Sequence, residues 1–275
     1  LDGDVLGGPL PGDAVQALGF GLPLAAALAT ALSQVVGGTV PLFYFARKNS
    51  SILRLGRTSF DGRAILKACT NGSSEFMSNV SMNIVGMLYN TQLLKFAGEN
   101  GVAAYGVMMY VSMIFSAAFI GYSIGTAPVV SYHDGARNFP ELKSLLRKSL
   151  VVIGLFGVCM VASAELLSSR LARMFVGYDA ALMELTVSGF QIFALSFIFM
   201  GFAIYGSSFF TALNDGLTSA AISFLRTLVF QVAAVLLLPT IWDIDGIWMS
   251  IVVAEFMAVV LTAAFLATKR RKYHY

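Results

Sequence analysis

Long apolar stretches alternate with short polar segments, most of them basic, along this chain of 275 residues. Three stretches, 14–46, 100–133 and 185–214, contain no Asp, Glu, Lys or Arg. Each is longer than the roughly 20 residues that cross the hydrocarbon core of a bilayer as a helix. Together with shorter apolar stretches they predict seven spanning helices, near residues 20–45, 68–96, 102–130, 149–169, 185–212, 218–239 and 246–268.

Composition also favours a membrane protein made of helices. Hydrophobic residues make up 57% of the chain and charged residues 12%, about half of the charge that a soluble domain carries. A β-barrel would show short segments of alternating polarity, whereas long apolar runs satisfy their backbone hydrogen bonds in lipid as helices. We therefore expect an all-α integral membrane protein with seven transmembrane helices, in which Cys69 and Cys159 are small packing residues.

Positive charge is distributed unevenly between the connecting segments. Of the 18 Lys and Arg residues, 15 fall on one alternating set, and Lys95, Arg170 and Arg173 fall on the other. The positive-inside rule places the basic set in the cytoplasm, so we expect a multi-pass protein of the cell membrane with a cytoplasmic C-terminus. Trp242 and Trp248 lie where an interfacial aromatic belt would place them. The net charge of +3 follows from this asymmetry and requires no nucleic-acid partner.

The second predicted helix carries polar side chains along one face. On a helical wheel, Glu75, Asn79, Asn83, Gly86 and Asn90 fall within about 80° of one another. A face with a carboxylate and three amides is costly against lipid, so it should face other helices or a water-filled cavity. The length of the stripe favours a cavity; the alternative is that the asparagines join helices through hydrogen bonds of about 1 kcal/mol or less.

The third predicted helix has a second, milder polar stripe. Tyr105, Ser112, Ser116 and Ser123 fall within about 40° of one another, and we expect the two stripes to share one cavity. Methionines on these two helices would suit an adaptable surface, but we expect them to fill the core. They are Met77, Met82, Met87, Met108, Met109 and Met113.

Signatures of enzymes and metal sites are missing from the sequence. His133 and His274 are isolated, no Cys or His pair has the spacing of metal ligands, and no glycine-rich loop precedes a phosphate-binding lysine. We expect no catalytic residue, no metal site and no cofactor.

The stretch 121–138, G-Y-S-I-G-T-A-P-V-V-S-Y-H-D-G-A-R-N, combines two glycines and a proline with a polar exit. It resembles the corresponding helix of the multidrug and toxic compound extrusion (MATE) transporters, and the resemblance covers nearly all of the chain beyond residue 16. The matching positions are Gly121, Gly125, Pro128, Ser131, Gly135 and Ala136. Supporting segments are A-A-A-L-A-T-A-L-S-Q-V-V-G, N-G-S-S-E, G-V-A-A-Y-G, S-F-L-R and D-G-I-W.

The resemblance implies two lobes of six helices, and this chain would hold the last helix of the first lobe and all of the second. The first methionine, Met77, lies inside the second predicted helix, which agrees with a missing N-terminal lobe. The expected parts are a residual external loop (1–16), the last helix of the first lobe (17–46), a cytoplasmic linker (47–66), the six-helix second lobe (67–268) and a basic cytoplasmic tail (269–275).

The resemblance also implies a function, that of a multidrug efflux antiporter. Such a protein exports small, often cationic amphipathic compounds in exchange for sodium ions or protons and works in a lipid bilayer. Because one lobe and one helix cannot alternate by themselves, we expect this chain to transport nothing alone. The alternatives are a lipid-linked oligosaccharide flippase of the same superfamily and a non-transporting remnant.

Two carboxylates within the predicted helices are candidates for coupling to the ion. Glu255 is nine residues beyond Gly246, about 14 Å along a helix and close to the membrane midplane, and Glu75 lies about 12 Å from Lys67. A carboxylate at such a depth must be paired, protonated or bound to a cation. The alternative is a structural ion pair, for example with Arg226.

The remaining candidates line or move the cavity. Substrate-cavity candidates are Asn79, Asn83, Asn90, Tyr105, Ser112 and Ser116. Gly121, Gly125 and Pro128 would make a bendable end to the third helix, because proline frees backbone groups there and small residues let neighbouring helices slide. The alternative is close helix packing combined with an ordinary helix exit.

Overall fold

The computed structural model describes residues 12–47 and 60–275, and every regular element among them is a helix. The elements are α1 (Gly12–Ala46), α2 (Gly62–Gly135), α3 (Phe139–Val176), α4 (Ala180–Ala194), α5 (Ser196–Ala212), α6 (Gly216–Phe224), the π-helix η1 (Leu225–Phe230), α7 (Gln231–Leu237) and α8 (Pro239–Tyr273). The all-α fold class is thereby confirmed.

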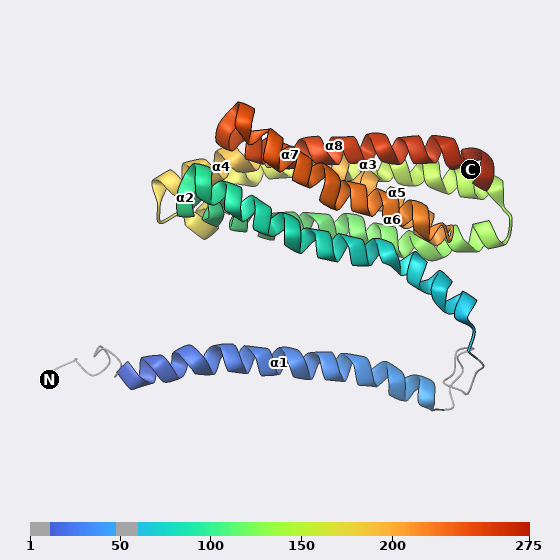
Figure 1. Ribbon diagram of the computed structural model, residues 1–275, viewed down its shortest axis with the longest axis horizontal. Helices are drawn as coiled ribbons and strands as arrows, with labels where there is room; N and C mark the ends of the chain where they lie inside the picture. The colour runs from blue at the N-terminus through green and yellow to red at the C-terminus, as the bar shows by residue number, and fades with distance from the viewer. Residues whose placement is uncertain (1–11, 48–59) are drawn as a thin grey trace. The chain divides into compact units, whose positions relative to one another are not determined.

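The chain divides into two compact units, residues 1–60 and residues 61–275. Helix α1 belongs to the first unit, and α2 to α8 form the second (Figure 1). Most of the predicted linker, 48–59, and most of the predicted external loop, 1–11, lie outside the described residues.

Several helices are long and apolar enough to cross a membrane. Five of the described helical segments pass this criterion singly, and α4 and α5, which meet at a bend of 47°, pass it together as a sixth. Helices α6, η1 and α7 form one of the five, because the π-helix joins α6 to α7 without a break. The protein is therefore a multi-pass membrane protein.

Helix α2 consists of two arms that meet at Gly98. This residue has φ 63° and ψ −153°, a backbone conformation that only glycine adopts at low cost. Tyr89 and Tyr105, on opposite sides of the break, stack with their ring centroids 5.2 Å apart. A continuous helix would separate two residues 16 positions apart by about 24 Å, so the chain reverses at Gly98 and the two arms run antiparallel (Figure 1).

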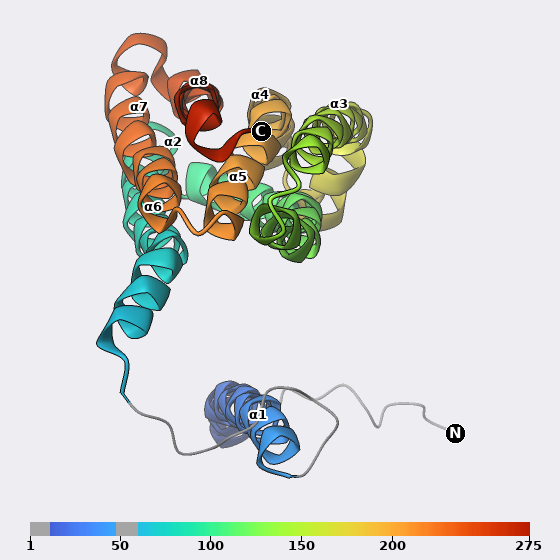
Figure 2. The ribbon, with the colours of Figure 1, turned by 90° about the vertical axis from the view of Figure 1, so that its right-hand side faces the viewer.

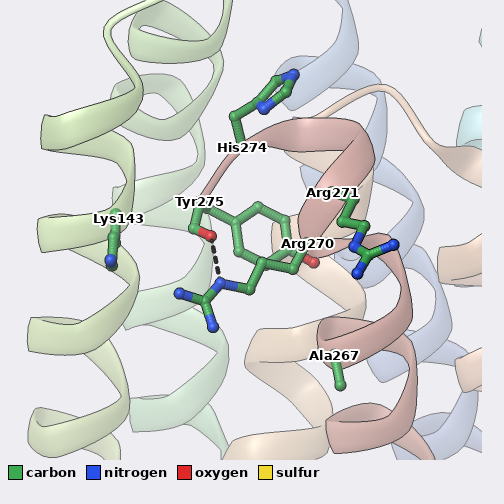
Figure 3. A pocket seen from close by; sticks show the side chains of 6 residues that line it. All are labelled: Lys143, Ala267, Arg270, Arg271, His274 and Tyr275. Atoms are coloured by element: carbon green, nitrogen blue, oxygen red, sulfur yellow. Dashed lines mark hydrogen bonds between the residues drawn. The ribbon is translucent and has the colours of Figure 1, made fainter.

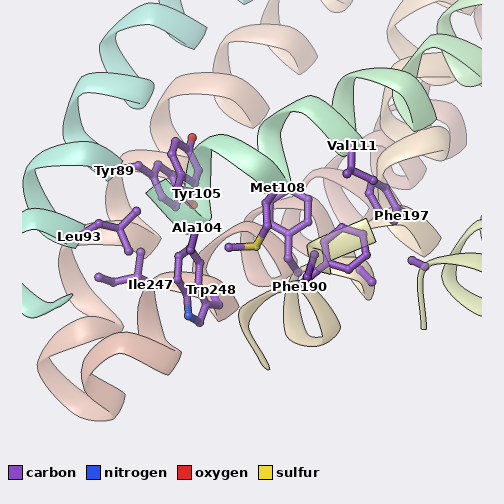
Figure 4. Packing of buried hydrophobic residues seen from close by; sticks show 14 of the residues in the cluster. Tyr89, Leu93, Ala104, Tyr105, Met108, Val111, Phe190, Phe197, Ile247 and Trp248 are labelled. Atoms are coloured by element: carbon purple, nitrogen blue, oxygen red, sulfur yellow. The ribbon is translucent and has the colours of Figure 1, made fainter. Parts of the chain in front are cut away.

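Helix α5 is the central helix of the second unit. It contains no charged residue and contacts α2, α3, α6 and α8, and Figure 2 shows it between α6 and α3 in a view along the helices. One apolar cluster around it includes Met108, Phe190, Phe197 and Trp248, several of which are seen in Figure 4. A second cluster, towards the C-terminal end of α8, includes Phe209, Phe210 and Tyr275.

Some residues differ from the sequence prediction in their exposure. Trp248 is 1% exposed and packs on Gly189, so its assignment to an interfacial belt was wrong, whereas Trp242 is exposed. Cys69 and Cys159 are exposed rather than packed.

The methionines also divide in a way the sequence did not predict. Met108 lies in the core, but Met82, Met87 and Met113 are exposed on the second unit. For these three, core filling was wrong within residues 61–275.

Asp215 ties the end of α8 to the turn between α5 and α6. Its Oδ2 accepts a hydrogen bond from the Tyr273 hydroxyl at 2.8 Å and lies 3.4 Å from Lys269 Nζ and 3.8 Å from Lys272 Nζ. Its Oδ1 accepts from the backbone N–H of Thr218 at 3.3 Å and so caps α6. Burial of Asp215 acts to raise its pKa, but the hydrogen bonds from Tyr273 and Thr218 and the charge of Lys269 outweigh burial, so that the pKa is lowered.

Asp215→Asn is expected to destabilise the second unit by about 1 kcal/mol at pH 7, because it removes the charge that attracts both lysines while an amide can still cap α6. A carboxylate with a lowered folded pKa stabilises the fold above its unfolded pKa of about 3.9 and loses this contribution as pH falls through the folded pKa. The difference between wild type and variant should therefore shrink below about pH 4 in detergent unfolding experiments. Asp179→Asn is the matched control, since Asp179 caps α4 without an ion pair in the described structure; an equal loss there would contradict the assignment.

Candidate functional site

The first arm of α2 exposes the predicted polar stripe. Glu75, Asn79, Asn83 and Asn90 are exposed on the second unit, and Gly86 is half-buried with open space where a side chain would begin. We call these five residues the amide face. The buried side of the same arm is formed by Ser74, Ser81, Val85, Tyr89 and Leu93. The arm is thus packed on one side, with the amide face turned away from the other helices of its unit.

The amides bond within their own helix. Asn79 Nδ2 donates to the Glu75 carbonyl at 2.8 Å, and Asn83 Nδ2 donates to the Asn79 carbonyl at 3.0 Å. Within the described residues neither side chain is hydrogen-bonded to another helix. Bonding between helices therefore does not account for the stripe within residues 61–275, and the amide oxygens remain able to accept bonds from water or a solute.

Apolar side chains border the amide face. Phe76, Val80 and Met87 on the same arm are exposed by 62%, 41% and 73%. Because a carboxylate and three amides lie beside aromatic, aliphatic and thioether side chains, this surface offers both hydrogen bonds and adaptable apolar contact.

The second polar stripe does not join the amide face. Tyr105 and Ser112 are 8% and 7% exposed, and Tyr105 lies in the packed cluster against Tyr89 (Figure 4). Ser116 is half-buried, and its hydroxyl donates to the Met113 carbonyl at 3.2 Å. The expectation that both stripes share one cavity was wrong for residues 61–275, since Tyr105 and Ser112 face the core.

Glu255 and Arg226 form a buried ion pair. Arg226 Nε lies 2.8 Å from Oε2 and 3.1 Å from Oε1 of Glu255, and the two side chains are 15% and 3% exposed. The Tyr89 hydroxyl on α2 donates to Oε1 of Gln231, which follows η1 directly, at 2.9 Å. Glu255 is thus neutralised by a neighbour, as the structural alternative anticipated.

Glu75 differs from Glu255 in its exposure and in its lack of an ion-pair partner within the described residues. It is exposed on the amide face, and it has no ion-pair partner among the residues that the structure describes. Of the two coupling candidates, Glu75 is the one with a carboxylate open to a solute or an ion.

Sequence reasoning missed the π-helical turn that carries Arg226. Residues Leu225–Phe230 form η1, and such turns are rare and frequently occur at functional sites. Gln231, which follows directly, was visible in the sequence as an isolated polar residue in an apolar run. No sequence signal marks the π-helix itself.

A group of hydroxyls between α5 and α6 was also missed. Ser207 Oγ lies 2.9 Å from the hydroxyls of Ser219 and Ser223, and Thr211 Oγ1 lies 2.6 Å from that of Ser219. The hydroxyls satisfy one another across the helix pair, which is the usual role of serines between spanning helices.

The glycines and proline of the second α2 arm lie on an exposed surface. Gly121, Gly125 and Pro128 are exposed, and a side chain at either glycine would meet nothing within 4 Å in the described structure. Close packing is therefore not their role within residues 61–275. The helix runs through them with helical backbone angles as far as Gly135.

Comparison with known proteins adds the family and the fold. A family model described as MatE matches residues 76–237. The multidrug export protein MepA of Staphylococcus haemolyticus (strain JCSC1435) is 24% identical over 260 residues, which cover 92% of this chain and 56% of that protein. The chain therefore spans little more than half the length of this curated relative.

Solved structures share the arrangement of helices. A crystal structure of MATE in complex with MaL6 has a TM-score of 0.85 at 22% identity, covering 94% of this chain and 58% of that one. An outward-facing multidrug resistance MATE family transporter has a TM-score of 0.81 at 22% identity, covering 90% and 56%. At this identity the likeness shows the fold.

Proposed function

The chain belongs to the MATE family of membrane transporters, and from that premise we propose that it forms the second lobe, with one helix of the first, of a multidrug efflux antiporter. Its relatives are transporters, and it is not an enzyme. The seven spanning helices, the lobe boundary within residues 47–66 and the cytoplasmic C-terminus are parts of this proposal.

The exposed amide face carries the proposal. A carboxylate and three amides along a membrane-spanning arm are too costly to leave against acyl chains, and the other helices of residues 61–275 do not cover them. A first lobe facing this arm across a hydrated vestibule would explain why the polar groups are uncovered within residues 61–275 without lying against acyl chains. Amide oxygens and flanking methionines there would accept varied amphipathic cations.

The cycle would consist of rocking of the two lobes around the vestibule. A ligand shifts such an equilibrium only by its differential affinity for the two states. Glu75, on the vestibule wall, is placed to bind a sodium ion or proton in one state and release it in the other. Glu255 holds helices α6–η1–α7 and α8 together through Arg226 and has a structural role in this scheme. Gly121, Gly125 and Pro128 would permit the second arm of α2 to bend during rocking.

The flippase alternative gains no support from a specific observation. Its lipid-linked sugar phosphates would require a cationic cavity, yet the basic side chain expected inside a span, Arg226, is neutralised by Glu255.

Export assays with the two-lobed transporter that contains this chain test the proposal. Replacing both Asn79 and Asn83 by Ala should lower export of an amphipathic cation about thirtyfold, because two hydrogen-bonding groups contribute about 1 kcal/mol each. In the same assay Glu75→Gln should abolish the dependence on the ion gradient. Replacing Glu255 and Arg226 together by Met, which leaves neither charge without its partner, should preserve it.

Thr91→Ala is the matched control for the asparagine variants. Thr91 is exposed on the same arm and donates to the carbonyl four residues back, as the asparagines do, but lies outside the amide face. Equal loss of export in this control, or full export by the asparagine variant, would contradict the proposal. Wild-type protein that exports nothing would favour a non-transporting remnant.

A further inference from the structure

A basic pocket of about 500 Å³ lies where α3 begins and α8 ends. Figure 3 shows Lys143 on α3 facing the side chains from the end of α8 across it. Its lining residues are Lys143, Ala267, Arg270, Arg271, His274 and Tyr275.

The end of the described chain folds back to shape this pocket. His274 adopts a left-handed conformation with φ 57°, and its ring lies 5.0 Å from that of Phe139 at the start of α3. Tyr275 is buried, and its hydroxyl donates to the Leu266 carbonyl at 3.1 Å. Arg270 Nε donates to the Tyr275 backbone oxygen at 3.2 Å. The pocket is therefore held by packing from both helices.

Two basic side chains of the pocket have no carboxylate partner in the described structure. Lys269 and Lys272 on the same helix pair with Asp215. In contrast, Lys143 and Arg271 have no carboxylate within 4.0 Å among the described residues, and both are exposed. A pocket with such an excess of donors and positive charge attracts an anion with several acceptor oxygens.

Exposed apolar surface continues from the pocket along α3. At spacings of three or four residues, Lys143 and Arg147 are followed by Val151, Leu155 and Val158, which are 56%, 62% and 59% exposed. Residues with this spacing share one face of a helix, so a cationic end leads into an apolar stripe.

Helix α8 also has basic residues at the pocket followed by exposed apolar residues along one face, and α5 contacts both α3 and α8. Arg271 and Ala267 lead to Val260 and Phe256, which are 54% and 51% exposed. The Phe256 ring lies 5.4 Å from that of Phe199 on α5, and α5 also contacts α3. Two exposed apolar stripes, one on α3 and one on α8, thus begin at the cationic pocket, and both helices contact α5.

We propose that this pocket binds the headgroup phosphate of an anionic phospholipid, with its acyl chains along the apolar stripes of α3 and α8. Cationic pockets between spanning helices bind acidic lipid headgroups in this way. Charge complementarity selects an acidic headgroup, and the apolar stripes favour a lipid over free phosphate. The inference does not depend on export, because none of the residues that line the pocket belongs to α2 or to the amide face.

Native mass spectrometry of the chain, released from micelles with equimolar phosphatidylglycerol and phosphatidylethanolamine of identical acyl chains, tests the proposal. Wild type should retain phosphatidylglycerol preferentially. Lys143→Gln combined with Arg271→Gln should weaken this retention at least about tenfold, since each basic group near an acidic lipid contributes measurably to its binding. Lys148→Gln, which removes one exposed charge from α3 outside the pocket, should retain the lipid as wild type does.

Three outcomes would overturn the proposal: equal retention of both lipids by wild type, equal loss in Lys148→Gln, or complete displacement of phosphatidylglycerol by millimolar inorganic phosphate. The last would identify a free-anion site in place of a lipid site. Circular dichroism checks the fold of each variant. If the double variant does not fold, Arg271→Gln alone, at an exposed position, should still weaken retention several-fold, and unchanged retention there overturns the proposal.

Discussion

Arg226→Met is expected to lower the free energy of unfolding of the second unit by about 3–5 kcal/mol, because it leaves the Glu255 carboxylate buried without its partner. Glu255 is 3% exposed and both of its oxygens face Arg226 Nε. Removing a charge from water costs several kcal/mol per ion unless a neighbour compensates for it.

The double variant, Arg226→Met with Glu255→Met, separates the pair from simple loss of packing. Replacing both charges by apolar groups of similar length is often neutral, so most of the lost stability should return. Unfolding in mixed micelles, followed by helical circular dichroism, measures all three proteins. Arg170→Met, at an exposed position on α3, should change stability by no more than about 0.5 kcal/mol. A single Arg226 variant as stable as wild type would show that the pair is hydrated and contributes little.

The polar stripe of α2 shows what periodicity can predict. Glu75, Asn79 and Asn83 were placed on one face from their spacing alone, and the structure exposes them together. Spacing fixes the angles between residues of one helix. A prediction of which residues share a face therefore does not depend on what surrounds the helix.

The second stripe shows where the same reasoning stops. Tyr105 and Ser112 do share a face, but that face is turned into the core. Periodicity does not fix how a helix is rotated about its axis against its neighbours, which depends on how side chains from several helices fit. Trp248 was misplaced for the same reason. A Trp near a helix end is typical of the membrane interface, and the sequence does not show that the ring of Trp248 packs against Gly189.

The pairing of Glu255 with Arg226 was anticipated as an alternative, because a buried carboxylate requires a partner and few basic residues lie within the spans. The π-helix at 225–230 was not anticipated, because helix propensities do not distinguish α from π turns in an apolar run.

Exposed methionines such as Met82 and Met87 were assigned to a core. Their hydrophobicity predicts burial without saying whether lipid, a solute or another lobe covers them.

A cysteine placed on the amide face is expected to react with a water-soluble thiol reagent at least about tenfold faster than a cysteine at a lipid-facing position. The reason is that a thiol reacts as its thiolate, which forms readily only in water. Asn83 lies 15 residues before the break at Gly98, and Leu155 lies 16 residues into α3 with 62% exposure. Both positions are thus about 23 Å from a helix end. Cys69 and Cys159 are exposed, so both are first replaced by Ser.

The most direct test of the central claim is the rate at which a membrane-impermeant cationic thiosulfonate modifies Asn83→Cys in the two-lobed transporter, compared with Leu155→Cys. If the amide face lines a hydrated vestibule, Asn83→Cys reacts at least about tenfold faster, and an exported cation slows it. Equally slow modification of both positions would mean that the amide face lies against acyl chains or is sealed by other helices, and would contradict the proposed transport path.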